Sequence, residues 1–425
     1  MGLKKRIEEL EKEVKELREM WEEHIKICPL FQKKEVPSFV KEDVNHRHKP
    51  SGQKEGHEGY ARHIPERIDF IKKAAIKRCP DCEGKLSNIQ EIRERYVEDI
   101  PEVRTIITKY EIERRYCKHC KKIVEAEVKD ALPNARFGLR SMLFIAFLKL
   151  GMRMPSKKIL ELMKTTYNLR ISDGEIYKIL EQLSNAFGPH YKELEKRMKD
   201  AAVKHIDETS WRIDGKNNWL WIFINKEIAL YVVNKHRSSK VPMKILGNQE
   251  GNVLVSDGYS AYTTLCKVAK CGHQLCWAHI LRNAKSLAED FHEGKYILLR
   301  LKDIYNQAKS FDHKATEEQV ERLQKRINFL ATKMYKHTKV DKFAKSLCRN
   351  QENLFRFASN PEIESTNNRA ERGLRHAVLI RKISNGSRSK NGAEITCKLL
   401  SVMETMKLQD QNPVTGMMNL LQNTK

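Results

Sequence analysis

Two aspartates follow short apolar segments that have the pattern of buried strands. Asp207 comes directly after an apolar pair in VKHIDETSW, and Asp257 follows the apolar run 253–255 in NVLVSDGYSAY. Neighbouring strands of a sheet lie about 5 Å apart. Two carboxylates at such a short distance repel each other strongly unless a cation lies between them. The two aspartates therefore predict a site for a divalent metal ion.

A third acid is expected, because two-metal phosphoryl transfer uses a few carboxylates and leaves room for the substrate phosphate. Glu371 is the candidate. It lies in IESTNNRAERGLRHAVLIRK, which has the pattern of a helix, and it borders the apolar face of that helix. Arg372 and Arg375 lie nearby and are suited to meet phosphates.

Two other acids compete for places in this site. Glu208 neighbours Asp207, but consecutive residues of a strand point to opposite faces. Glu364 precedes the Asn-Asn pair and is an alternative to Glu371 as third ligand. Three unrelated surface acids remain the alternative for the whole set.

Four of the ten cysteines form two CxxC pairs. Cys79 and Cys82 frame CPDC, Cys117 and Cys120 frame CKHC, and 34 residues separate the pairs. Two such pairs supply the four thiolates of a tetrahedral zinc site, so they predict a zinc ribbon with strands in the region 107–116. Two independent redox motifs are the alternative, which the absence of a thioredoxin-like unit disfavours.

A second group of cysteines and histidines surrounds the segment CWAH, which holds Cys276 and His279. Cys266, Cys271 and His273 are close in sequence. The favoured interpretation is structural, with Cys276 and His279 bracing a strand-to-helix junction by hydrogen bonds. A second zinc site is the alternative, and a nucleophilic Cys–His pair lacks an orienting acid.

The elements that must position these acids begin near residue 200. The run 219–224 (WLWIFI) and the run 228–233 (IALYVV) predict a strand hairpin with a turn at Asn225. The interval from Asp257 to Glu371 is 114 positions, against 50 from Asp207 to Asp257, and within it Val320, Leu323, Ile327 and Leu330 share one helical face. A helical insertion is therefore expected at about 285–360.

The segments before the core show three different sequence patterns. Residues 1–28 carry a short heptad pattern, which predicts a helix that pairs two protomers or packs on its own domain. Residues 45–63 are rich in His, Gly and basic residues and read as a linker. Residues 137–198 predict helices, with a capping box at Ser172 and Glu175. They fit either a helix-turn-helix or an ordinary helical hairpin.

The segment 384–390 after the Glu371 helix is polar, basic and contains Gly386. Arg388 and Lys390 make it a candidate to grip backbone phosphates. A solvated turn is the alternative.

Composition favours a polyanionic partner. The chain has 425 residues with 80 Lys and Arg against 56 Asp and Glu, a net charge of +24. The longest apolar run is residues 142–148, far short of the roughly 20 that a spanning helix needs. No signal peptide is recognisable, so a cytoplasmic, nucleoid-associated protein with reduced thiols is expected.

Several of these segments together resemble the large transposase of the insertion-sequence sixty-six family, a group of prokaryotic DDE transposases. The resemblance covers nearly the full length. It rests on DETSW (207–211), SDGYSAY (256–262), CWAHILRNAK (276–285), TNNRAERGLR (366–375), SNGSRSKNGAE (384–394) and the later LLSVMETMKLQ.

The resemblance implies an α/β, RNase H-like core whose mixed sheet has antiparallel strands followed by parallel ones. It implies Asp207, Asp257 and Glu371 as catalytic ligands of two Mg²⁺ (or Mn²⁺) ions, with Asp207 bridging both. Strand cleavage and strand joining would use this one site with different nucleophiles. The implied partners are double-stranded transposon ends and target DNA, a second copy of the chain, and small accessory proteins.

The expected organisation has six parts. They are a coiled-coil helix (1–30), a linker (31–70), a zinc ribbon (71–130), a helical, helix-turn-helix-like region (131–198), a catalytic core with its insertion (199–395) and a helical tail (396–425). A non-catalytic DNA-binding derivative and a metal-dependent nuclease without a joining step are the competing functions.

Overall fold

The computed structural model describes residues 63–423. The expected coiled coil and most of the expected linker lie outside these residues. The chain divides into two compact units, whose described parts are residues 63–106 and residues 107–423. Within residues 63–106 the chain forms neither helix nor strand.

A five-stranded sheet lies in the larger unit, in the order β5-β4-β3-β6-β7. The antiparallel strands are β3 (Val203–Ile213), β4 (Lys216–Ile224) and β5 (Ala229–Asn234). Strand β6 (Val253–Ser256) runs parallel to β3, and β7 (Gly272–Leu275) runs parallel to β6. The expected change from antiparallel to parallel strands thus occurs at β3, in the middle of the sheet.

The β4–β5 hairpin forms where the two apolar runs predict it. Residues 220–224 of β4 are all buried. The side chain of Asn225 closes the turn, since its Oδ1 accepts the N–H groups of Glu227 and Ile228 at 2.9 and 2.8 Å. An Asn side chain that binds backbone two residues on is a common turn device.

Helix α14 (Lys390–Leu408) covers the free edge of β5. Ser401 Oγ accepts the N–H of Tyr231 at 2.8 Å, and Thr405 Oγ1 accepts that of Ala229 at 3.1 Å. These bonds satisfy strand donors that a bare edge would leave unpaired. The expected boundary at residue 395 falls inside this helix. Only α15 (Pro413–Asn423) follows it.

The helices before the sheet pack as a bundle. They are α2 (Leu139–Ala146), the π-helical turn η1 (Phe147–Gly151), α3 (Ser156–Tyr167), α4 (Asp173–Ala186) and α5 (Gly188–Asp200). The predicted capping box is present, with Ser172 and Glu175 bonded to each other's backbone N–H. Helix α4 contacts α2 and α14, so its buried side serves this bundle.

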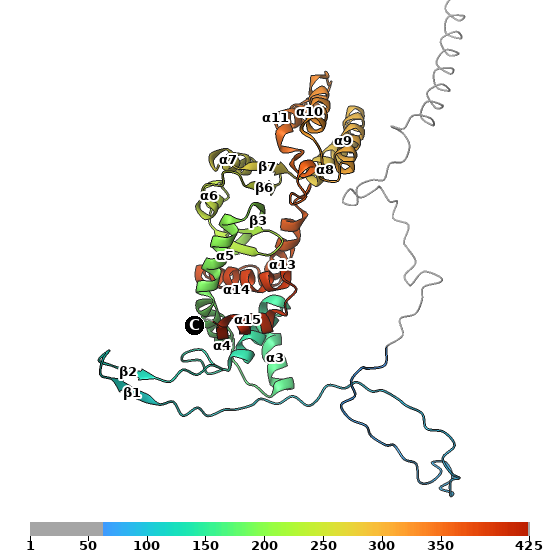
Figure 1. Cartoon of the computed structure of the whole chain (residues 1–425), viewed down its shortest axis with the longest axis vertical. Coiled ribbons are helices and arrows are strands. Elements are labelled where there is room, and N and C mark those ends of the chain that lie inside the picture. Colours follow the sequence, from blue (N-terminus) through green and yellow to red (C-terminus); the bar gives the residue numbers. More distant parts are fainter. Residues whose placement is uncertain (1–62, 424–425) are drawn as a thin grey trace, which may run out of the picture. The chain divides into compact units, whose positions relative to one another are not determined.

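A helical subdomain follows β7, and its core also takes in Val255 of β6 and Leu275 of β7. It consists of α8 (Trp277–Asp290), α9 (His292–Ser310), α10 (Glu317–Thr332), α11 (Thr338–Arg349), η2 (Gln351–Asn353) and α12 (Arg356–Ser359). In Figure 1, α9 to α11 lie beyond β6 and β7, at the end of this unit opposite α3, α4 and α15. These helices occupy the region where a helical insertion is expected, at about 285–360, and the first of them, α8, begins at Trp277.

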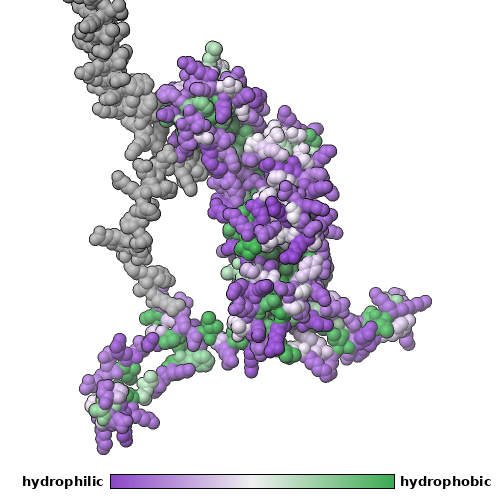
Figure 2. Space-filling view, turned by 180° about the vertical axis from the view of Figure 1, so that it is seen from behind, coloured by the Kyte–Doolittle hydropathy of each residue, from purple (hydrophilic) through white to green (hydrophobic). Residues whose placement is uncertain are grey.

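A short hairpin, β1 (Arg114–Cys117) and β2 (Lys122–Glu125), presents CKHC at its turn, whereas residues 107–113 form no strand although their alternation suggested one. Figure 2 shows hydrophilic residues over most of the displayed face of the larger unit. None of the helices in residues 63–423 has the length and apolar character to cross a membrane.

Candidate active site

The parallel pairing of β3 and β6 brings Asp207 and Asp257 to the same level of the sheet. The register pairs His205 with Val255, and each aspartate lies two residues further along its strand direction. The side chain of Asp207 accepts the N–H of Glu208 at 2.9 Å, and that of Asp257 accepts the N–H of Tyr259 at 3.0 Å. The two strands that precede these aspartates are thus neighbours in the sheet.

The third acid, Glu371, lies in the first turn of α13 (Asn368–Ser384), which packs on β3 and β4. Gly373 permits the close approach, because a Cβ there would lie 2.4 Å from Ile222 Cδ1. The Tyr231 hydroxyl also donates to the Gly373 carbonyl at 2.9 Å. The sequence pattern placed Glu371 beside the apolar face of this helix, and that face is the one against the sheet.

Asn367, just before α13, fixes the start of this helix to the first strand. Its Nδ2 donates to the Ile206 carbonyl at 2.8 Å, and its Oδ1 lies 3.1 Å from His205 Nδ1. Its backbone N–H lies 3.1 Å from Cys276 Sγ. Asn367 is 1% exposed, so these bonds are shielded from water. Sequence reasoning gave it no role, although the Asn-Asn pair before a helix was visible.

The pKa of Asp207 reflects its burial and the charges of the other acids. Burial is the main cause that raises the pKa of Asp207 to about 7. The N–H of Glu208 acts in the opposite direction, while the charges of Glu208, Asp257 and Glu371 raise this pKa further. Since charge repulsion between carboxylates is what a divalent cation relieves, the donor set fits a hard metal ion.

Glu371 also faces two cationic or potentially cationic side chains from α8. Its Oε1 lies 3.5 Å from Arg282 Nη2 and 3.7 Å from His279 Nδ1. Burial lowers the pKa of His279, and the Arg282 charge lowers it further, so the imidazole is neutral at pH 7. Arg282 therefore supplies the balancing charge.

The two competing acids lie elsewhere. Glu208 points to the opposite face of β3, where it pairs with Arg237 at 2.6 Å and accepts the hydroxyl of Tyr262, a residue of α7 (Ser260–Val268). Glu364 pairs with Arg369. Both are engaged in ion pairs, as Glu371 is with Arg282.

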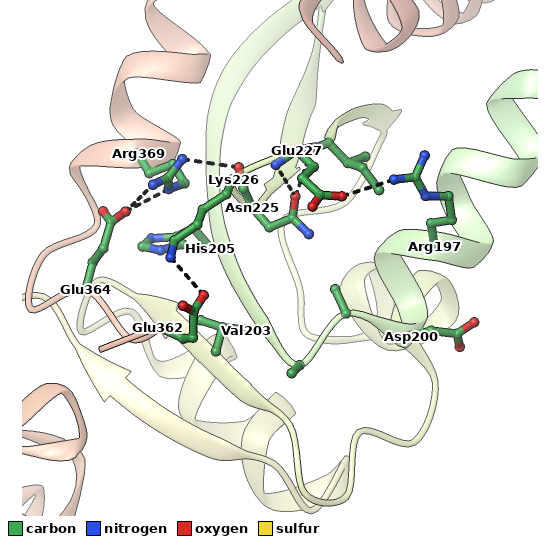
Figure 3. Close-up of a pocket in the computed structure, with 13 residues that line it drawn as sticks. Arg197, Asp200, Val203, His205, Asn225, Lys226, Glu227, Glu362, Glu364 and Arg369 are labelled. Atoms are coloured by element: carbon green, nitrogen blue, oxygen red, sulfur yellow. Dashed lines mark hydrogen bonds and ion pairs between the residues drawn. The ribbon is translucent and has the colours of Figure 1, made fainter. Parts of the chain in front are cut away.

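A cavity of about 420 Å³ opens at the beginning of β3 (Figure 3). His205 lines it, as do three charge pairs that bridge neighbouring elements. These are Lys226–Glu362, Arg197–Glu227 and Arg369–Glu364. Because these charges neutralise one another, the cavity offers no strong electrostatic preference for an anion.

The candidate DNA-binding residues lie on α13 and on the segment after it. Arg372, Arg375, Arg388 and Lys390 are exposed, and Lys390 lies 3.7 Å from Glu394. The segment 384–390 is docked on the end of β3, since Ser387 N–H donates to the Arg212 carbonyl at 2.9 Å and Ser387 Oγ accepts Trp211 Nε1–H at 3.1 Å. Ser387 therefore anchors this loop to β3.

Each CxxC pair forms its own turn. In residues 63–106 the Glu83 N–H donates to the Cys79 carbonyl at 2.9 Å, and Cys82 lies within this turn. In the larger unit the Cys120 N–H lies 3.4 Å from Cys117 Sγ. Backbone N–H groups lower the pKa of both Cys79 and Cys117 toward the thiolate form that binds metal.

The second cysteine group separates into two. Cys266 and Cys271 hydrogen-bond with each other through their side chains. Cys276 and His279 instead lie beside Glu371, with the ligand atoms of all three within 4.8 Å of one another. Cys276 Sγ accepts the Asn367 N–H at 3.1 Å, whereas His279 Nδ1 makes no hydrogen bond within the described residues. The proximity of Glu371 was not anticipated.

Comparison with known families identifies the chain. A model for the transposase IS66 family matches residues 135–395, and one described as the zinc-finger binding domain of transposase IS66 matches residues 77–121. The first match covers more than half of the chain, so the protein belongs to the IS66 transposase family, as its motifs predicted. The second includes both CxxC pairs. No curated protein matches significantly. Both matches support DNA as the partner.

Proposed function

We propose that the protein is a DDE transposase that cleaves the ends of an insertion sequence and joins them to target DNA. Its core would be RNase H-like, with Asp207, Asp257 and Glu371 as ligands of two Mg²⁺ (or Mn²⁺) ions. The observation that carries this proposal is the register of β3 and β6, which sets Asp207 and Asp257 at one level beside the helix of Glu371.

The side chains around the acids suit this chemistry. Asp207 must give up its proton to serve as a ligand, so protons compete with the metal below about pH 7. Arg282 offsets the charge of Glu371, and the exposed Arg372, Arg375 and Arg388 are placed to meet phosphates. Bound Mg²⁺ would activate a water or a 3′-hydroxyl and stabilise the leaving oxygen.

The decisive experiment replaces Asp257 by Asn and follows donor cleavage, joining of pre-cut donor ends, and DNA binding at low salt. Cleavage and joining should each fall by about 10²-fold or more, because a metal ligand is lost. Binding should persist, since it rests on Lys and Arg charges.

The matched control is Asp214→Asn, the same chemical change in the exposed β3–β4 turn. It should retain joining. Normal joining by Asp257→Asn would remove Asp257 from the mechanism. Cleavage by the unsubstituted protein without any joining of pre-cut ends would point to a nuclease.

For the cysteine pairs, we propose that Cys79, Cys82, Cys117 and Cys120 hold one structural Zn²⁺. The support is the zinc-finger match over both pairs and the backbone N–H groups that favour the thiolates of Cys79 and Cys117. Zinc bound to four thiolates supplies folding free energy to a segment that has little core of its own.

A further inference from the structure

The start of α8 and the start of α13 present three different metal-ligating groups to one point. Cys276 is the N-cap of α8, His279 follows one turn later, and Glu371 reaches them from α13. One ligand atom from each lies within 4.8 Å of the other two.

The spacing of His279 and Glu371 suits a tetrahedral ion. Bonds of about 2.0 to 2.3 Å at tetrahedral angles place ligand atoms roughly 3.3 to 3.8 Å apart. His279 Nδ1 and Glu371 Oε1 are 3.7 Å apart. A sulfur, an imidazole nitrogen and a carboxylate oxygen form a set that Zn²⁺ accepts, whereas Mg²⁺ prefers oxygen ligands alone.

A second observation points to a ligand at the same place. His279 Nδ1 is buried, and it has no hydrogen-bond partner within the described chain although it faces Glu371. A buried polar atom without a partner costs free energy, and a bound cation would satisfy it.

The surroundings hold the ligands in place and leave an approach from solvent. Cys276 Sγ accepts the Asn367 N–H at 3.1 Å, and the Trp277 N–H donates to the Ser365 carbonyl at 3.0 Å. These bonds join the two ligand-bearing segments. The side chains of His279 and Glu371 are 35% and 33% exposed, so an ion can enter and a solvent molecule can complete its coordination.

We propose that Cys276, His279 and Glu371 form a binding site for a thiophilic divalent cation such as Zn²⁺, and that its occupation withdraws Glu371 from the Mg²⁺ site. The binding site stands on the geometry alone. The competition rests on the proposed function, because it requires Glu371 to be a Mg²⁺ ligand.

Cobalt is the probe for the binding site, because a Co²⁺–thiolate bond gives a charge-transfer absorption. The full-length chain with Cys79, Cys82, Cys117 and Cys120 all changed to Ser removes the other thiolate set. Titration with Co²⁺ should give a thiolate band that saturates near one equivalent and disappears when Zn²⁺ is added.

Adding Cys276→Ser to that background should abolish the band, while adding Cys266→Ser, at another buried cysteine, should leave it. Adding Glu371→Gln keeps the thiol and should weaken Co²⁺ binding by about tenfold or more. A missing band in the four-serine chain, or a band that survives Cys276→Ser, overturns the site.

Joining of pre-cut ends in Mg²⁺ with added Zn²⁺ tests the competition. The Zn²⁺ concentration that halves each protein's own uninhibited rate should rise about tenfold or more for Cys276→Ser. If the same Zn²⁺ concentration halves the joining rate of the unsubstituted chain and of Cys276→Ser, the proposed competition is overturned. If the unsubstituted chain joins nothing in Mg²⁺, the proposed function fails, and the cobalt titration still decides the binding site.

Discussion

At the scale of single residues, burial and the charges of neighbouring acids change the pKa of Asp207. Burial raises its pKa to about 7 from the ordinary 3.8, so the folded protein binds this proton more tightly than the unfolded chain does. The contribution of this raised pKa to the free energy of unfolding is therefore fully present below about pH 4 and is lost as the pH rises toward 7.

Replacing Asp207 by Asn should remove this loss when metal is absent. In EDTA, Asp207→Asn should unfold at a higher temperature than the unsubstituted protein at pH 8, and the difference should vanish near pH 4. A rise of pKa from 3.8 to about 7 sets a ceiling of about 4 kcal/mol on the gain. Thermal unfolding across this pH range measures it.

Asp214→Asn serves as control, and its unfolding temperatures should follow those of the unsubstituted protein at every pH. A difference for Asp207→Asn that stays constant from pH 4 to pH 8 would contradict the electrostatic origin of the effect.

The sequence revealed some of these residues and hid others, for a physical reason. Asp207 and Asp257 follow apolar strand segments, and strand pattern is a local property that a sequence displays. The proximity of Cys276 and His279 to Glu371 depends on how α8 and α13 meet, almost a hundred residues apart. That meeting is set by buried bonds of Asn367, which no local pattern encodes.

At the scale of elements, the strands and long helices were predictable because their apolar runs and periodicities are strong. Ile107, Tyr110 and Ile112 have the apolar pattern of a strand but are exposed, and residues 107–113 pair with no other strand. A strand needs a partner as well as a pattern. The expected boundary at 395 falls inside α14, which continues to residue 408 and packs along β5.

The loop after α13 depends on one glycine. Gly386 has φ +102°, and a Cβ there would lie 2.2 Å from the Arg212 carbonyl oxygen. Gly386→Ala should therefore displace the loop that carries Arg388, with a loss of about 1 to 3 kcal/mol of stability. The variant should unfold at a lower denaturant concentration, and its affinity for DNA at low salt should fall.

Gly174→Ala is the matched control, because a Cβ at this position in α4 meets nothing within 4 Å. Alanine should be neutral or stabilise α4 by up to about 1 kcal/mol. Equal behaviour of the two variants would show that Gly386 is not needed to dock the loop.

The two CxxC turns should act as one zinc-binding element. Metal analysis of the purified protein should find tightly bound zinc, and changing Cys79 and Cys117 to Ser should remove one equivalent. Cys348→Ser, at a half-buried cysteine of α11, should remove none. Unchanged zinc in the double variant would refute the ribbon.

At the scale of the whole molecule, a net charge of +24 predicts DNA binding that weakens steeply with salt. Each phosphate contact contributes about 0.9 to the slope of log K against log salt. Arg372→Ala and Arg388→Ala should each lower the slope by about that amount if their side chains meet phosphates. Fluorescence anisotropy over a salt series measures this.

Lys226→Ala is the control, because Lys226 already pairs with Glu362 at 2.8 Å. It should leave the slope unchanged. Slopes for the two arginine variants that equal that of the unsubstituted protein would exclude them from the phosphate-binding surface.

The hydrogen bond from the Trp277 N–H to the Ser365 carbonyl has a consequence for how such proteins diversify. The chain leaves for the helical subdomain and returns from it at adjoining points. The core of that subdomain also takes in Val255 of β6 and Leu275 of β7, and its first helix, α8, carries the Arg282 that faces Glu371. Length changes are therefore best placed far from these contacts, and an insertion at the 98% exposed Met334, between α10 and α11, should leave the sheet and its carboxylates where they are.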